Sequence, residues 1–210
     1  MVGVLTALAA EQTVEALHWS HQTRNTELTL SSEVQQSVDA VAERQALDAC
    51  LRSQLVALRA AALGGGGGPA FAPPTAAATS GRVVGDLYQT PWRAWTRGSW
   101  SAAAASNSLN HVDPQRLIAY ANAYKAIEDI DAIIRQERNG KGALAPLALG
   151  KLGPQEAGQV LSALTNLDGD RADIGVAGRD LFEDAGKLGI RPHAANAYLA
   201  AFRKRTGVCV

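Results

Sequence analysis

Residues 4–63 read VLTALAAEQTVEALHWSHQTRNTELTLSSEVQQSVDAVAERQALDACLRSQLVALRAAAL, sixty positions without a glycine or a proline. Because these two residue types are the usual interruptions of a helix, the stretch predicts one very long helix. At a rise of 1.5 Å per residue an unbroken helix of this length reaches about 90 Å. That is longer than a compact domain of this size needs, so we expect part of the helix to project.

The long helix changes character along its length. Residues 2–10 are almost purely apolar, and the sequence turns polar at Glu11. From Val34 onward apolar residues recur mostly every three or four positions, as one buried helical face requires. The pattern predicts a membrane-proximal anchor tail and stalk over residues 1–32 and a packed part beyond them.

The apolar tip is too short to cross a bilayer as it stands. About ten apolar residues precede Glu11, whereas a spanning helix needs roughly 20. Either the chain starts inside a longer transmembrane helix, or the tip packs on a partner protein; we favour the anchor. Leu5 and Leu8 then lie at the membrane, and Trp19 lies near its interface, where amphipathic rings concentrate.

The rest of the chain divides at glycines and prolines. The run Gly64–Gly68 and the prolines after it predict a loop over residues 64–85, and no Lys-Ser/Thr follows to make it a phosphate loop. Further helices are expected from Thr90-Pro91, from Asp113-Pro114 to Asn139-Gly140, around residues 144–149, from Pro154 to Leu188, and from His193 to Lys204.

Together these signals predict an all-α fold. A long N-terminal helix carries a bundle of four or five shorter helices packed on its C-terminal half, and residues 33–210 form this bundle domain. Strands are not expected, because aromatic and β-branched runs are scarce.

Composition and motifs argue against several functions. The 20 basic and 20 acidic residues balance, without a basic stripe for nucleic acid. Glu15-x-x-His18 occurs once, where a di-iron bundle needs two such pairs. Asn166-x-Asp168-x-Asp170 opens like a calcium loop, but Arg171 replaces the glycine of the sharp turn. No nucleophile motif is present. We therefore expect no metal, no cofactor and no enzymatic activity.

Cys50 and Cys209 are the only cysteines. Buried free thiols are one interpretation. The other interpretation, which requires an oxidising compartment, is a disulfide that ties the C-terminal tail to the long helix. In the chain-entropy model such a cross-link stabilises the folded state by roughly 4 kcal/mol. We favour the disulfide.

Aromatic residues concentrate in one segment, with two tyrosines on a later helix that could face them. These residues are Tyr88, Trp92, Trp95, Trp100, Tyr120 and Tyr124. Such a cluster could form a cage for a cationic ligand. The bulky core of an otherwise alanine-rich bundle is the favoured interpretation.

Several short motifs are spread over most of the chain. They are Gly3–Gln12 leading to His18-Trp19, the Trp92/Trp95 segment, Tyr120-x3-Tyr124 and Leu188-Gly-Ile190. On these motifs the chain resembles a loosely defined group of uncharacterised bacterial single-pass inner-membrane proteins. The resemblance implies an N-terminal anchor helix, a periplasmic all-helical domain and no known activity. The chain departs from the group in lacking most of the membrane span.

The expected function is that of a non-enzymatic, membrane-anchored periplasmic protein, a structural or assembly subunit of a membrane complex. Its expected partners are the membrane, through the N-terminal helix, and a protein or a second copy of the chain. The alternative is a helical domain that senses a small molecule through the Trp/Tyr cluster.

Overall fold

The computed structural model describes residues 2–64, 87–149, 152–194 and 196–206, and every regular element among them is helical, which confirms the all-α fold class. The elements are α1 (Val2–Ala46), α2 (Asp48–Leu63), α4 (Gly98–Ala105), the short 3-10 helix η1 (Ser108–His111), α5 (Pro114–Gly142), α6 (Ala145–Leu149), α7 (Pro154–Lys187) and α8 (Asn196–Thr206). Apart from Gly64, the predicted loop over residues 64–85 lies outside the described residues.

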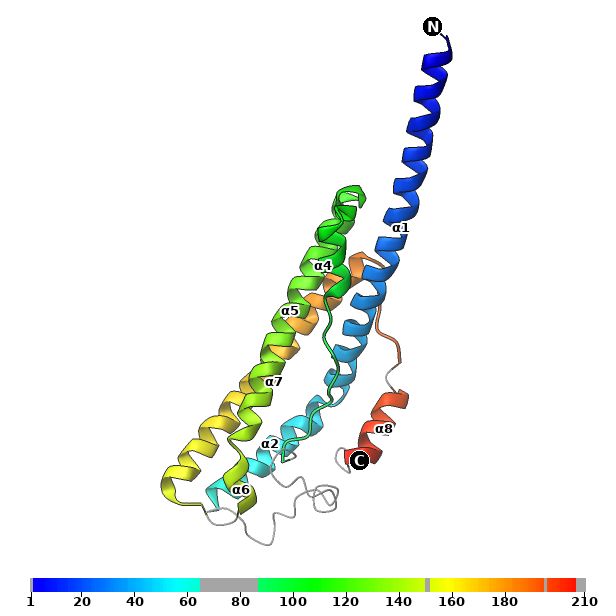
Figure 1. The fold of residues 1–210 in the computed structure, drawn as a ribbon. Coiled ribbons are helices and arrows are strands. Elements are labelled where there is room, and N and C mark those ends of the chain that lie inside the picture. Colours follow the sequence, from blue (N-terminus) through cyan, green and yellow to red (C-terminus); the bar gives the residue numbers. More distant parts are fainter. Residues whose placement is uncertain (1, 65–86, 150–151, 195, 207–210) are drawn as a thin grey trace.

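The prediction of one uninterrupted helix over residues 4–63 is wrong at a single position. The amide of Leu47 donates to the carbonyl of Arg44, 3.1 Å away, which tightens the turn there and ends α1. Leu47 is itself buried, and α2 continues at an angle to α1 (Figure 1). Both α1 and α2 pack against α7, so the bend keeps the chain in contact with that helix.

The predicted start of α5 and the predicted end of α7 are confirmed, whereas α5 runs through the predicted stop at Asn139-Gly140 to Gly142. Asp113 accepts hydrogen bonds from the amides of Gln115 and Arg116 at the start of α5. At the end of α7, Gly189 has a φ of +79°, and the amide of Ile190 donates to the carbonyl of Ala185. This is the Schellman arrangement that a glycine in left-handed conformation permits.

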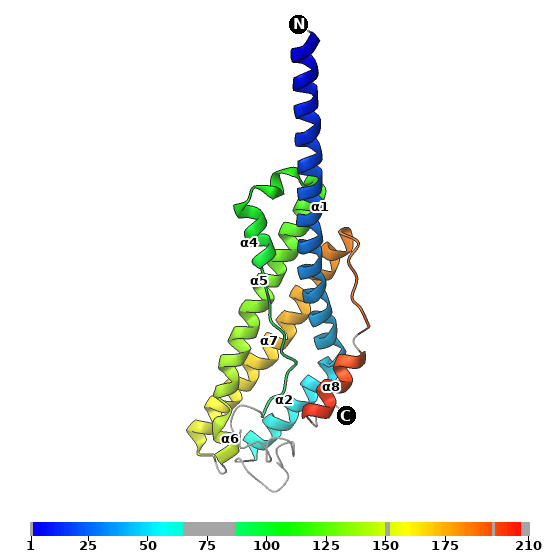
Figure 2. The ribbon, with the colours of Figure 1, turned by 45° about the vertical axis from the view of Figure 1, so that its right-hand side comes forward.

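Two predicted helix starts are wrong. Residues 87–97 do not form a helix, and α4 begins only at Gly98. The segment instead runs as an extended strap along the bundle, with the backbone of Gln89 bonded to the side chain of Gln54 (Figures 1 and 2). The last helix begins at Asn196 and not at His193, whose amide donates to the carboxylate of Asp39.

Two apolar clusters lie one after the other along the molecule (Figure 2). The first joins the second half of α1 with α4, α5 and the C-terminal half of α7. The second joins α2, α6, the N-terminal half of α7 and α8. α5 and α7 pack along one another, and α7 contributes residues to both clusters.

The contact between α1 and α7 is close at one glycine. A Cβ built on Gly178 would lie 2.5 Å from Cγ1 of Val41 and 3.3 Å from Nε2 of Gln45. Only a residue without a side chain lets the two helices approach this far.

We predict that Gly178→Ala destabilises the protein, because relieving the overlap with Val41 costs about 1–3 kcal/mol, more than the roughly 0.5–1 kcal/mol that alanine gains in a helix. Urea unfolding followed by circular dichroism measures the change. Gly169→Ala is the control: its Cβ meets nothing within 4 Å, so it should stabilise. Equal effects of the two substitutions would contradict the close contact.

Candidate functional site

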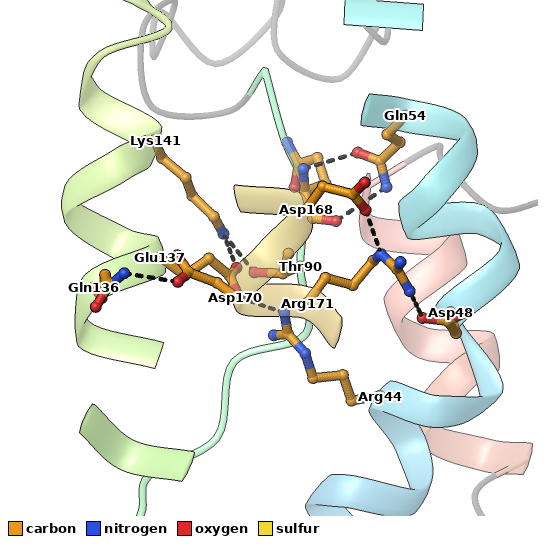
Figure 3. Close-up of polar contacts among 11 residues, drawn as sticks. Arg44, Asp48, Gln54, Thr90, Gln136, Glu137, Lys141, Asp168, Asp170 and Arg171 are labelled. Carbon is orange, nitrogen blue, oxygen red and sulfur yellow. Dashed lines mark hydrogen bonds and ion pairs between the residues drawn. The ribbon is translucent and has the colours of Figure 1, made fainter. Parts of the chain in front are cut away.

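A buried ion-pair network lies beside the bend between α1 and α2 (Figure 3). Arg44 of α1 pairs with Glu137 of α5, and their side chains are only 6% and 2% exposed. Lys141, one turn further along α5, places Nζ 3.1 Å from Oε1 of Glu137 and also bonds the hydroxyl of Thr90. Three separate segments of the chain therefore meet at one carboxylate.

The charges around Glu137 keep it ionised. Burial alone would raise the pKa of Glu137, but the positive charges of Arg44 and Lys141 outweigh it and hold the pKa below its usual range. Burial lowers the pKa of Lys141, and the neighbouring Glu137 opposes this. The group is thus a mutually compensated cluster of charges in the interior.

The residues of the motif that resembles a calcium loop lie on α7, next to this network, and make ion pairs and hydrogen bonds with neighbouring helices. Arg171 pairs with Asp168, at 3.0 Å, and with Asp48 of α2. Asp170 accepts a hydrogen bond of 2.9 Å from Gln136. The helix runs through Gly169 without a break. Among the described residues no three metal-binding side chains gather as a metal site would require.

A second buried carboxylate, Glu33 of α1, holds the start of α4. It accepts hydrogen bonds from the amides of Gly98 and Ser99 at 3.0 and 3.1 Å, and from the hydroxyl of Tyr124 at 2.8 Å. The N-cap residue of α4, Arg97, supplies no side-chain cap. Glu33 therefore satisfies amides at the positive end of that helix from a distant part of the sequence.

These hydrogen bonds set the protonation of both partners. Burial alone would raise the pKa of Glu33, but the bonds from Tyr124, Thr96 and the two amides bring it below the usual value. Burial, the bond to Glu33 and its charge raise the pKa of the Tyr124 hydroxyl.

The six aromatic residues proposed as a ligand cluster do not gather at one place. Tyr88 belongs to the second apolar cluster, and Trp92 is 61% exposed. The other four pack in or against the first cluster, where Trp100 stacks on Tyr124 with ring centroids 5.0 Å apart. The cluster thus divides between two cores, with Trp92 on the surface.

The first turns of α1 extend beyond the other helices (Figures 1 and 2). Every residue from 11 to 18 is exposed. Trp19 is the first with a described contact to the bundle, since its ring stacks on His111 of η1 at 3.8 Å between centroids. Packing therefore begins before the predicted boundary at residue 33. None of the described helices contains a stretch apolar and long enough to cross a membrane.

The other predicted site residues are only partly described. Nothing is described of the side chains of Leu5 and Leu8, so their place at a membrane stays a prediction. Cys50 lies partly buried on α2, but Cys209 lies outside the described residues, and their disulfide also stays a prediction. Leu199 and Phe202 of α8 pack in the same apolar cluster as α2.

The buried charges have a signal in the sequence, which is their position on the apolar faces of α1 and α5. Glu33, Ser37 and Arg44 occupy the apolar face of α1, and Glu137 continues the apolar face of α5 after Ile130. A charged residue in phase with buried apolar residues predicts a buried pair. The pattern does not identify its partner, because Arg44 and Glu137 are 93 residues apart.

The chain matches no protein-family model, and no curated protein or solved structure is significantly similar to it. Inferences about its function therefore rest on its own residues and their geometry.

We predict a ranking of stability losses around Glu137. Glu137→Gln should cost about 3 kcal/mol or more, because it leaves two buried cations without a counter-ion. Arg44→Gln should cost less, since Glu137 keeps Lys141. Asp131→Asn, which breaks a partly exposed pair with Arg135 on the same helix, should cost under about 1 kcal/mol. Urea unfolding at pH 7 gives the three values, and equal losses would contradict a compensated buried cluster.

We also predict that stability falls in acid through Glu33 and Glu137. Their pKa values are lowered by folding, so the stability they confer is complete above the unfolded value of about 4.3 and is lost as pH falls through the folded values. Lys141 is protonated in both states there and adds no slope. Glu33→Gln should be less stable than the wild type at pH 7, with the gap closing towards pH 3 in urea titrations. A gap independent of pH would exclude an ionised Glu33.

Proposed function

We propose that the chain is a non-enzymatic helical protein that serves as a structural or assembly subunit of a bacterial membrane complex. In this proposal residues 2–18 of α1 form an attachment arm, and the remaining helices form a bundle packed on the second half of the long N-terminal helix. The periplasmic location and inner-membrane attachment rest on the resemblance of the sequence motifs to single-pass proteins of that membrane.

One observation carries the proposal: three exposed apolar side chains on one face of α1, two of them on the arm and the third beyond His21, which form the apolar stripe. Val14, Leu17 and Leu28 are 67%, 56% and 61% exposed. At 100° per residue they fall within about 60° of one another around the helix axis. The buried residues of α1, such as Leu30 and Val41, lie on the other side. The stripe therefore faces away from the bundle and is available to a partner.

An open groove beside the stripe has no opposite wall among the residues that the structure describes. Its lining consists of Glu11, Val14, Glu15, His18 and Trp19, all from α1. Because a groove lined by a single helix is closed only by something that lies against it, this surface suits docking of another helix or an apolar surface. Its mixture of apolar and acidic side chains is typical of the rim of a protein interface.

The bundle has the features of a rigid platform. Its central acidic and basic side chains are paired across α1, α5 and the strap, and Glu33 fixes α4 to α1. Buried pairs of this kind hold helices in one arrangement, which suits a subunit that positions other components.

We predict that Val14→Gln/Leu17→Gln weakens attachment about tenfold or more, because two apolar side chains lose contact with the partner surface. The assay is co-sedimentation of the purified chain with right-side-out bacterial inner-membrane vesicles, with liposomes of the extracted lipids in parallel. Binding to the vesicles alone indicates a protein partner, and binding to both indicates the lipid surface.

The matched control replaces two equally exposed apolar residues of the bundle, Val56→Gln/Ile118→Gln, which are 61% and 55% exposed in the wild type. It should bind like the wild type. Lack of wild-type binding to either preparation, or an equal loss in the control, would overturn the arm as the attachment site. Unchanged thermal melting would show that both double variants are folded.

A further inference from the structure

A groove of about 510 Å³ lies on the surface beside the bend of the N-terminal helices, where α2 faces the middle of α7. Its size falls in the range of small-molecule sites, about 300–1,000 Å³. Of the described residues, three arginines line it, Arg52 from α2 and Arg171 and Arg179 from α7, and Asp48 is the one acidic residue among them. The groove lies on the bundle, apart from the attachment arm.

The arginines are not fully neutralised. Arg171 is the inner one, 12% exposed, and is held by Asp48 and Asp168. Arg52 shares Asp48 with it at 3.2 Å and is 63% exposed. In the part of the chain that the structure describes, Arg179 makes no ion pair.

Acidic residues cancel only part of the positive charge, because Asp48 and Asp168 are the carboxylates paired with the lining arginines among the described residues. Asp168, which pairs with Arg171, lies outside the groove lining. Glu183, one turn beyond Arg179 on α7, is paired with Lys187 at 3.1 Å. Two exposed guanidinium groups therefore flank the groove with positive charge in excess, while the inner arginine is already fixed in place.

The floor of the groove leaves room between the arginines. Arg171, Gly175 and Arg179 follow one another at intervals of one helical turn, so they share a face of α7 and span about 12 Å. A Cβ on Gly175 would meet nothing within 4 Å, so the surface of α7 between the two arginines is open at this position. Val176 lines the groove beside it and offers apolar contact.

We propose that this groove binds a phosphorylated small molecule. The planar guanidinium groups of Arg52 and Arg179 donate paired hydrogen bonds to phosphoryl oxygens, a geometry for which arginine is better suited than lysine. Arg171 supplies a fixed positive charge at the base, the open surface at Gly175 leaves room for the phosphoryl group, and Val176 contacts the organic part. This inference goes beyond the proposed attachment function and does not depend on it.

The test is isothermal titration calorimetry of the full chain with inorganic pyrophosphate and with glycerol 3-phosphate, using glycerol as the uncharged control. We expect saturable binding of the phosphate compounds, weakened by added salt, and none of glycerol. Arg52→Gln and Arg179→Gln should each weaken binding about tenfold, the loss expected for one charge-assisted contact. Both side chains are surface groups, so thermal melting should change little.

Arg138→Gln is the matched control, because Arg138 is an exposed arginine of α5 outside the groove, and it should bind like the wild type. Co-sedimentation with phosphatidylcholine vesicles, with and without phosphatidic acid, tests a lipid headgroup as the source of the phosphate. Binding to the phosphatidic acid vesicles alone would overturn the small-molecule ligand. Lack of any saturable phosphate binding, or wild-type affinity in Arg52→Gln/Arg179→Gln, would overturn the site.

Discussion

The buried contact of Arg44 with Glu137 is the interaction on which the arrangement of the molecule depends. It lies where α1 ends, where α5 passes and where the strap of residues 87–97 crosses both, and Lys141 extends it to Thr90. A buried carboxylate is tolerated only when cations or hydrogen-bond donors compensate it, and at Glu137 the compensation comes from Arg44 and Lys141. The helices must therefore meet in the one register that brings these side chains together, and the two apolar clusters fill the space on either side.

Distant carboxylates also explain why the strap is not a helix. Glu43 binds Arg93 through both carboxylate oxygens, and Glu33 accepts hydrogen bonds from the amides of Gly98 and Ser99. These contacts hold the residues before Gly98 in an extended path, whatever their local preference. The same path separates Trp92 from Trp95 and so disperses the aromatic residues that are neighbours in sequence.

Local signals were sufficient for much of the fold. Asp113-Pro114 and Gly189 mark true helix ends, and the absence of glycine and proline from residues 4–63 correctly indicated continuous helix up to a single bend. The bend at Leu47 had no local signal, since nothing in that segment breaks a helix by itself. It results from packing of α1 and α2 against α7, with Gly178 permitting the close approach.

The sequence by itself determined the all-α class, the start of α5, the end of α7 and an N-terminal segment unlike the rest, because these follow from propensities and periodicity within a few turns. Only the tertiary structure decided which charges are buried together, where the aromatic rings lie, and that Arg52 meets Arg171 and Arg179 across a groove. The physical reason is that those contacts join residues about a hundred positions apart, and side-chain pairing at that distance exists only once the helices have packed.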